Sequence, residues 1–351
     1  MARHCIGLDI GTSAIKLVQL RSTRKGFVLQ NYGVEPVPPQ AIVDGNVMAP
    51  GPVVDAIRNL VKRIHLRGKD AAIAVGRNAV IIKRVVMPHL EGGALEEQIE
   101  WEIRQNIPFN RDEVTCDYEV LVERTPQDQM EVLLVAAKNE VAQQYVQVTR
   151  EAGLNPAVVD ASALALTNAV EASVGLSKEE SVAIILAGAT HSTISIVVKG
   201  VPAFHREVNV GGNTYTEAIA QRLAVSAESA EAYKVGGATT STPDVVPQEV
   251  HRILAQVSEQ IAGEYQRTLD FFMSDALVGN LARIHLAGGT ALVPQLAKAI
   301  QVRARIPVEI VDPFVNVAAD PRRFDLDYLR VHAPMLAVAF GLALRRPGDS
   351  E

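Results

Sequence analysis

The fold of this chain is decided by residues 6–20, Ile6-Gly7-Leu8-Asp9-Ile10-Gly11-Thr12-Ser13-Ala14-Ile15-Lys16-Leu17-Val18-Gln19-Leu20. Their apolar character predicts two buried strands that run in opposite directions around a tight turn. Asp9 is a carboxylate in an apolar strand, where a charge is costly unless a cation or a hydrogen-bond donor meets it. Gly11 allows a ligand to approach the backbone closely, and Lys16 on the return strand could reach the same ligand.

The turn of this hairpin is suited to phosphate. Its backbone amides and the hydroxyls of Thr12 and Ser13 together form a pocket of donors for phosphate oxygens. The alternative is a plain β-hairpin with a polar turn, because a motif this short has many false positives. The phosphate interpretation therefore depends on partners further along the chain.

Composition excludes several classes of protein. A chain of 351 residues exceeds the size at which one core usually stops growing, so we expect two lobes. A net charge of −6 and an aromatic share of 5% argue against general nucleic-acid binding. The eight histidines show no metal-ligand spacing, and Cys5 and Cys116 are expected to be reduced thiols. Without a signal peptide or an apolar span, a soluble cytoplasmic protein is expected.

The opening pattern returns in the second half of the chain. Residues 182–186 predict a buried strand, Gly188-Ala189-Thr190 a small-residue turn, and residues 193–198 a strand that runs back. Placing Gly188 on Gly11 aligns strand, turn and strand. Such a repeat predicts two related lobes, each with one phosphate-binding turn, and two facing turns would clamp a ligand.

Further glycine turns follow predicted strands in the second half. A strand over 201–208 ends at Gly211-Gly212, and a strand over 284–287 ends at Gly288-Gly289-Thr290. A helix with Glu231 and Lys234 lies between them. Glycines between a strand and a helix allow a ligand close to the backbone. Each feature has a plain alternative: Lys16 could extend to solvent, Glu231 and Lys234 could be an ordinary helix pair, and the glycines could be simple turns. Their shared order in both halves makes coincidence improbable.

The residues between the two repeats predict an insertion. The pattern over 81–153 is β-α-β-β-α, and it has no phosphate-binding turn of its own. We expect the first lobe at 1–80, the inserted partner-binding subdomain at 81–153, and the connecting segment and hinge at 154–180. The second lobe is expected at 181–332, with a smaller helical subdomain at 213–262 that contains a loop over 236–247, and a closing helix and tail at 333–351.

Taken together, these segments resemble the actin, Hsp70 and sugar-kinase superfamily. Residues 9–16 are similar to its first phosphate motif, 182–198 to its second, 284–296 to its adenosine motif, and 333–344 to the second helix that connects the lobes. Within the superfamily the chain most resembles the PilM family of type IV pilus assembly proteins, relatives of FtsA. The place of the insertion, the run Arg104-Gln105-Asn106-Ile107-Pro108-Phe109 and the segment 160–166 carry that resemblance.

The resemblance implies an α/β, two-lobed actin-like ATPase fold of duplicated ribonuclease-H-like lobes with an inserted subdomain. It implies ATP held by the residues named above, with Mg²⁺ at Asp9. It also implies a scaffold that docks the cytoplasmic N-terminal tail of PilN in a groove between the insertion and the first lobe. PilN would bring the chain to the inner membrane, and a homo-oligomer is possible. The alternatives are an active ATPase or an FtsA-like filament. A sugar kinase is unlikely, because no general-base carboxylate for an acceptor hydroxyl is evident.

Two positions depart from the superfamily pattern. Leu186 stands where the second phosphate motif usually has an aspartate, and Ser162 stands where an acidic residue is common in the first connecting segment. In the superfamily, these groups help to hold hydrated magnesium and to position the attacking water. Because positioning and charge stabilisation carry most phosphoryl-transfer catalysis, their loss is expected to weaken hydrolysis more than nucleotide binding.

Overall fold

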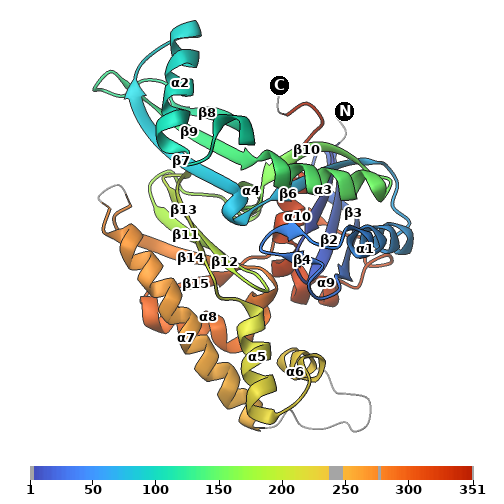
Figure 1. Cartoon of the computed structure of the whole chain (residues 1–351). Coiled ribbons are helices and arrows are strands. Elements are labelled where there is room, and N and C mark those ends of the chain that lie inside the picture. Colours follow the sequence, from blue (N-terminus) through green and yellow to red (C-terminus); the bar gives the residue numbers. More distant parts are fainter. Residues whose placement is uncertain (1–3, 237–247, 276–277, 350–351) are drawn as a thin grey trace.

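Two mixed β-sheets form the centre of the molecule (Figure 1). The computed structural model describes residues 4–236, 248–275 and 278–349. The first sheet has the strand order β10 (Asn155–Ala161), β6 (Asp70–Val75), β1 (Ile6–Ile10), β2 (Ala14–Thr23), β3 (Gly26–Pro36) and β16 (Val317–Ala318). The second has the order β13 (Val201–Val208), β12 (Ser192–Val198), β11 (Ser181–Ala187), β14 (Leu281–Ala287) and β15 (Val308–Ile310).

Both sheets repeat one topology. In the first, β1 runs antiparallel to β2 and parallel to β6. In the second, β11 runs antiparallel to β12 and parallel to β14. An antiparallel third strand, β3 or β13, follows each hairpin. The strand-turn-strand repeat predicted at Gly11 and Gly188 is thus confirmed.

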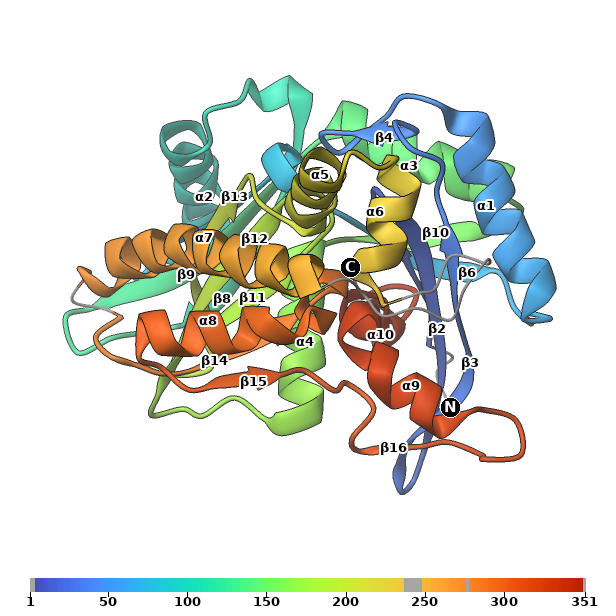
Figure 2. The same ribbon diagram turned by 90° about the horizontal axis from the view of Figure 1, so that it is seen from below.

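Helices cover the sheets in layers. Between the sheets lie α4 (Ser162–Val174) and α10 (Ala337–Ala343), whose small apolar residues share a core with both (Figure 2). The outer face of the first sheet is covered by α1 (Pro50–Arg63) and α3 (Asn139–Glu151). The second sheet is covered by α5 (Gly212–Leu223), α7 (Gln248–Met273) and α8 (Pro294–Ala304). The remaining helices are α6 (Ala227–Lys234), α9 (Leu326–His332) and the 3₁₀ turns η1 (Arg77–Ala79), η2 (Arg111–Glu113), η3 (Gly289–Leu292) and η4 (Ala333–Leu336).

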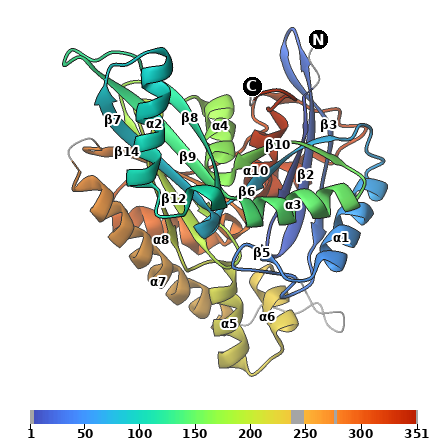
Figure 3. The same cartoon turned by 45° about the horizontal axis from the view of Figure 1, so that its top comes forward.

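A small sheet with its own core stands beside the two lobes. It has the order β7 (Val80–Pro88), β9 (Gln129–Lys138) and β8 (Val114–Val122), and α2 (Gly92–Asn106) packs on it. The element order expected for 81–153 is therefore present. However, the buried side chains of α3 pack with the core of the first sheet, and Figure 3 shows α3 beside α1 rather than α2. The proposed domain limits stay predictions.

Three details differ from the sequence expectations or fall outside the description. The connection over 36–52, which is rich in Pro and Gly and in which the sequence predicts no strand, contains a hairpin of β4 (Ile42–Val43) and β5 (Asn46–Val47), whose turn residues Asp44 and Gly45 both have positive φ. The closing helix is divided into the single turn η4, which has Pro334 near its start, and the α-helix α10. The loop expected over 236–247 lies, beyond Gly236, outside the described residues. None of the described helices has the length and apolar character needed to cross a bilayer.

Candidate functional site

The first phosphate turn is closed by an ion pair. Gly11 N–H donates to the Ala14 carbonyl at 3.1 Å. Asp9 and Lys16 are direct partners in the β1–β2 register, and Lys16 Nζ lies 2.9 Å from Asp9 Oδ2. The cation that Asp9 requires is therefore Lys16 itself. A Cβ at position 11 would lie 2.7 Å from Lys16 Nζ and 3.0 Å from the Ala14 carbonyl oxygen, so a side chain there would displace the flexible end of Lys16. The predicted hydroxyl residues Thr12 and Ser13 occupy the turn, where Ser13 is exposed.

The second turn repeats this backbone geometry without the ion pair. Gly188 N–H donates to the His191 carbonyl at 3.0 Å, again three residues ahead. In the β11–β12 register, Leu186 faces Thr193 where the first hairpin has the Asp9–Lys16 pair. The second hairpin thus keeps the shape of a phosphate-binding turn, but its strand presents no carboxylate at this position.

Three predicted glycine motifs meet at the second turn. The Gly188 carbonyl accepts hydrogen bonds from Gly212 N–H at 2.9 Å and from Thr290 Oγ1 at 2.7 Å. The Ala189 carbonyl accepts from Asn213 N–H at 2.7 Å. A Cβ at Gly211 would lie 2.5 Å from the Gly188 carbonyl oxygen, so these segments can meet only if position 211 has no side chain. The turns at 188–190, 211–212 and 288–290 form one assembly.

The predicted α6 residues join the same assembly. Lys234 Nζ lies 2.6 Å from Glu231 Oε2 and also donates to the Gly212 carbonyl at 3.3 Å. Its side chain is only 11% exposed. The pair is therefore more than a surface contact within one helix, because it ties α6 to the glycine turn. Glu231 Oε2 further accepts from Thr216 Oγ1 at 2.6 Å.

The two glycines of the predicted adenosine motif differ in role. Gly288 has φ +95°, and a Cβ there would lie 2.2 Å from the Ala187 carbonyl oxygen. Only glycine fits that position. Gly289 has open space where a Cβ would be, so the geometry does not require glycine there.

Three residues between the lobes are functional candidates that were not predicted from the sequence. Arg77 follows β6 and reaches across to Thr190, with Nη1 3.4 Å from Oγ1. Burial lowers the pKa of His191 to about 4, and the charges of Arg77 and Lys16 also lower it. Burial raises the pKa of Glu207, on β13, to about 7, against the lowering effect of Arg77. The charge of Lys16 in the first lobe therefore acts on His191 in the second.

Sequence signals for these residues existed. Glu207 is a carboxylate in a predicted strand, the same signal that drew attention to Asp9. Arg77 directly follows a buried strand and Gly76, at the strand end where α/β folds bind ligands. Asp44, whose Oδ1 lies 3.1 Å from Arg77 Nη2, is in an Asp-Gly turn, a strong hairpin signal. Ser162, at one of the two departures from the superfamily pattern, lies nearby, since a Cβ at Gly76 would meet its Oγ at 2.5 Å.

The residues present fit a nucleotide with hydrated magnesium. Three glycine turns of the second lobe meet, and backbone amides at such turns can bind phosphate oxygens, while Lys16 and Arg77 of the first lobe supply positive charge. In the described ranges, no three His, Cys, Asp or Glu side chains are grouped as a protein-made metal site would require. Magnesium is commonly held by one or two carboxylates plus substrate phosphates. Asp9 could supply such a contact when a nucleotide is bound.

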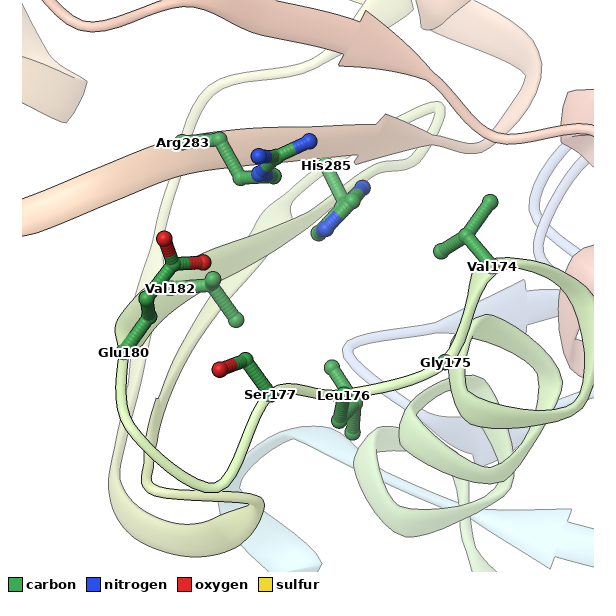
Figure 4. A pocket seen from close by; sticks show the side chains of 8 residues that line it. All are labelled: Val174, Gly175, Leu176, Ser177, Glu180, Val182, Arg283 and His285. Carbon is green, nitrogen blue, oxygen red and sulfur yellow. The ribbon is translucent and has the colours of Figure 1, made fainter.

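A separate cavity lies away from these turns (Figure 4). It has a volume of about 400 Å³ and is lined by the segment after α4 and by the first residues of β11 and β14, including Glu180, Arg283 and His285. The phosphate turns follow the opposite ends of the same lobe's strands. The Arg283 guanidinium is already paired with Glu309 at 2.8 Å. This cavity is not part of the phosphate site.

Comparison with protein families decides the identity. The profile described as type IV pilus assembly protein PilM matches residues 7–347. The chain belongs to the PilM family. A solved structure described as the PilM–PilN type IV pilus biogenesis complex is similar over 98% of this chain and 99% of that chain, with 28% identity and a TM-score of 0.84.

More distant structures share the family's fold. The ethanolamine utilization protein EutJ from Carboxydothermus hydrogenoformans has 16% identity and a TM-score of 0.59, over 98% of this chain and 90% of that one. MreB5 of Spiroplasma citri, solved with AMPPNP, has 14% identity and a TM-score of 0.53, over 98% and 96%. The two-lobed, actin-like ATPase fold expected from the sequence is confirmed.

Proposed function

We propose that this protein is an ATP-binding, actin-like scaffold of type IV pilus assembly, and that its inserted subdomain docks the cytoplasmic N-terminal tail of PilN. The observation that carries the proposal is the convergence of three glycine turns of the second lobe, with Arg77 of the first lobe reaching the same place, in a member of the PilM family. The similar PilM–PilN complex supports the partner, and the AMPPNP-bound actin-like relative supports the nucleotide. Binding to PilN would hold the chain at the cytoplasmic face of the inner membrane.

Each part of the chain has a proposed role. The turn at 11–13, with Asp9 and Lys16, would bind phosphates and magnesium from the first lobe. The turn at 188–190 would face it from the second lobe, and the segments around Gly211 and Gly288 would border the nucleoside, with Lys234 behind them. The small sheet with α2 has no such turn and is proposed to serve partner recognition, within the limits 81–153.

The nucleotide is tested by removing the ion pair of the first turn. Asp9→Ala is expected to weaken magnesium-dependent ATP binding, and Lys16→Ala to weaken binding through lost phosphate contacts. A charge-assisted contact contributes about 1.5–3 kcal/mol, so each affinity is expected to fall roughly tenfold or more. Isothermal titration calorimetry with Mg-ATP measures this. Because Leu186 leaves the second strand without a carboxylate, phosphate release in the same samples is expected to be very slow.

Matched controls exist on the surface of the first lobe. Asp55→Ala on α1 and Lys25→Ala in the β2–β3 turn remove exposed charges of the same kinds and are expected to leave ATP affinity unchanged. Unchanged affinity in both Asp9→Ala and Lys16→Ala would reject the nucleotide assignment. Rapid steady-state phosphate release that Asp9→Ala abolishes would instead favour an active ATPase.

The partner is tested by removing the small sheet. Ile82 and Val135 are direct partners in the antiparallel β7–β9 register, so an Asn-Gly turn can replace residues 83–134 and close the chain. This excision keeps α3 and the parts of β7 and β9 that pack on the first lobe. The intact protein is expected to capture a peptide of the PilN cytoplasmic tail in a pull-down, and the shortened protein to lose capture.

Two measurements make the pull-down decisive. Circular dichroism and ATP titration of the shortened protein check that both lobes remain folded. A matched pair of variants, Trp101→Ala on α2 and Phe271→Ala on α7, removes exposed aromatic rings from the small subdomain and from the second lobe respectively. Equal capture by the intact and shortened proteins would refute the docking proposal, as would no capture by the intact protein with ATP present.

A further inference from the structure

Arg77 occupies an unusual place for an arginine. It begins η1, the single turn that joins β6 of the first sheet to β7 of the small sheet. Its side chain is only 9% exposed, although arginine is rarely buried unless it is paired. Its backbone adopts the left-handed conformation, with φ +56°. Such strain in a non-glycine residue persists only where the surroundings hold it, and it is concentrated at functional sites.

The guanidinium of Arg77 is incompletely partnered. Nη2 lies 3.1 Å from Asp44 Oδ1, but the Asp44 side chain is 73% exposed. Nη1 makes a long contact of 3.4 Å with Thr190 Oγ1, in the second phosphate turn. Nε is buried and has no hydrogen-bond partner. Because the Asp44 carboxylate is largely in contact with water, which screens its charge, the guanidinium can exchange this partner for another anion.

Groups on both lobes lie within range of the Arg77 charge. Burial has the largest effect on the pKa of His191 and Glu207 in the second lobe and of Tyr145 on α3 in the first; the Arg77 charge acts on all three in the lowering direction, while the pKa values of Glu207 and Tyr145 remain raised. The backbone N–H of Arg77 also acts on the pKa of Glu207 in the lowering direction. Arg77 is thus a buried cation at the junction of the two lobes, beside the turn that is proposed to receive phosphates.

We propose that Arg77 binds the terminal phosphate of the nucleotide, exchanging its contact with Asp44 for that phosphate. This inference rests on the proposed nucleotide function and adds the residue that distinguishes ATP from ADP. The planar fork of an arginine matches phosphate oxygens in two-point contacts. The buried, unpartnered Nε supplies a further donor at the same place. Because Arg77 begins η1, the turn that leads into β7, the exchange would act at the point where the small subdomain joins the first lobe.

The plainer alternative is that Arg77 only braces the lobes. A brace would tie Asp44 and Glu207 of the two lobes to η1 whether or not a nucleotide is bound. Loss of Arg77 would then lower the stability of the protein and weaken the binding of ATP and of ADP equally. A terminal-phosphate ligand differs in one measurable respect, since ADP has no terminal phosphate for Arg77 to bind. The ratio of the two affinities therefore separates the two roles.

The experiment is calorimetric titration of the full-length protein with Mg-ATP and with Mg-ADP. Arg77→Ala is expected to weaken ATP binding about tenfold or more, the effect of one lost charge-assisted contact, with ADP affinity changed less than about twofold. Arg77→Lys keeps the charge but loses the fork, so its ATP affinity should fall between those of Arg77→Ala and the unmodified protein. Asp44→Asn frees the guanidinium and should leave ATP binding equal or slightly tighter.

The possible outcomes are distinct. Equal loss of ATP and ADP affinity in Arg77→Ala, or an unchanged ratio, would overturn this inference while leaving nucleotide binding intact. Binding of neither nucleotide by the unmodified protein would overturn the proposed function and this inference together. Thermal unfolding of each variant without nucleotide checks that it is folded. If Arg77→Ala does not fold, the ratio of ATP to ADP affinity is measured on Arg77→Lys instead.

Discussion

Replacing Gly341 by alanine is expected to lower the free energy of unfolding by at least ~3 kcal/mol, an effect at the upper end of overpacking substitutions. Gly341 lies on α10 where that helix crosses α4. A Cβ at this position would lie 1.8 Å from the carbonyl oxygen of Ala165. The obstacle is the backbone of a buried helix, so no side chain can rotate to make room. The helices between the sheets would have to separate. Urea denaturation followed by circular dichroism measures the loss.

A matched substitution isolates this effect. Gly93→Ala, on α2, introduces the same methyl group into open space, with nothing within 4 Å of the new Cβ. It is expected to change stability by less than ~1 kcal/mol, in the stabilising direction, because alanine restricts the unfolded chain. An unfolding midpoint of Gly341→Ala equal to that of Gly93→Ala would contradict the close crossing of α4 and α10.

Glu207→Gln is expected to stabilise the protein at pH 8 by an amount on the order of 1–3 kcal/mol, and by almost nothing at pH 4. Burial raises the pKa of Glu207 from 4.5 to about 7, and one of its oxygens, Oε1, is buried without a hydrogen-bond partner. A glutamine keeps the shape and the acceptor but carries no charge. The lower end of the range allows for the part of the side chain that water screens.

The sign follows from proton binding. Between about pH 4.5 and 7 the folded protein holds a proton on Glu207 that the unfolded chain releases, so this group lowers stability as the pH rises. Above pH 7 the full cost of a buried charge is present, and glutamine removes it. Below pH 4.5 Glu207 is protonated in both states, and the substitution has little to remove.

The comparison must be made between variant and unmodified protein. Burial lowers the pKa of His191 and His205 to about 4, so both histidines reduce stability as the pH falls below 6.5. Their effect is opposite in direction to that of Glu207, but it is common to both proteins and cancels in the difference. Glu119→Gln, at an exposed position on β8, is the control. A stability difference for Glu207→Gln that does not vary with pH would disprove the buried-carboxylate interpretation.

Local pattern was sufficient to predict much of the fold. Apolar runs bounded by glycine located both hairpins, and the match of Gly11 with Gly188 revealed the duplication before any strand pairing was known. The α7 stripe was also evident, because Val250, Ile253 and Val257 keep helical spacing and all are buried. These features depend on residues close together in the sequence.

Contacts between distant segments could not be predicted in the same way. The apolar stripe of α3 showed that one face is buried, but not that its partner is the first sheet rather than the small one. Arg77 and Thr190 are far apart in sequence and belong to different lobes, so their contact depends on how the lobes close. For Asp9, the sequence indicated that a cation was needed, and the strand register identified Lys16 as that cation.

Leu186 of the second hairpin affects which cellular quantity the nucleotide state of this protein can follow. In an enzyme that hydrolyses its bound nucleotide, each hydrolysis event ends the ATP-bound state, so hydrolysis sets how long that state lasts. Leu186 and Thr193 stand in the second hairpin where the first has a charged pair, so under the proposed function this protein would hydrolyse its nucleotide very slowly. In a protein that only exchanges its nucleotide, the fraction of molecules with ATP bound instead follows the ratio of ATP to ADP around it. With Arg77 bound to the terminal phosphate and β7 leading from it into the small subdomain, the protein would signal the cell's ratio of ATP to ADP to the pilus assembly machinery.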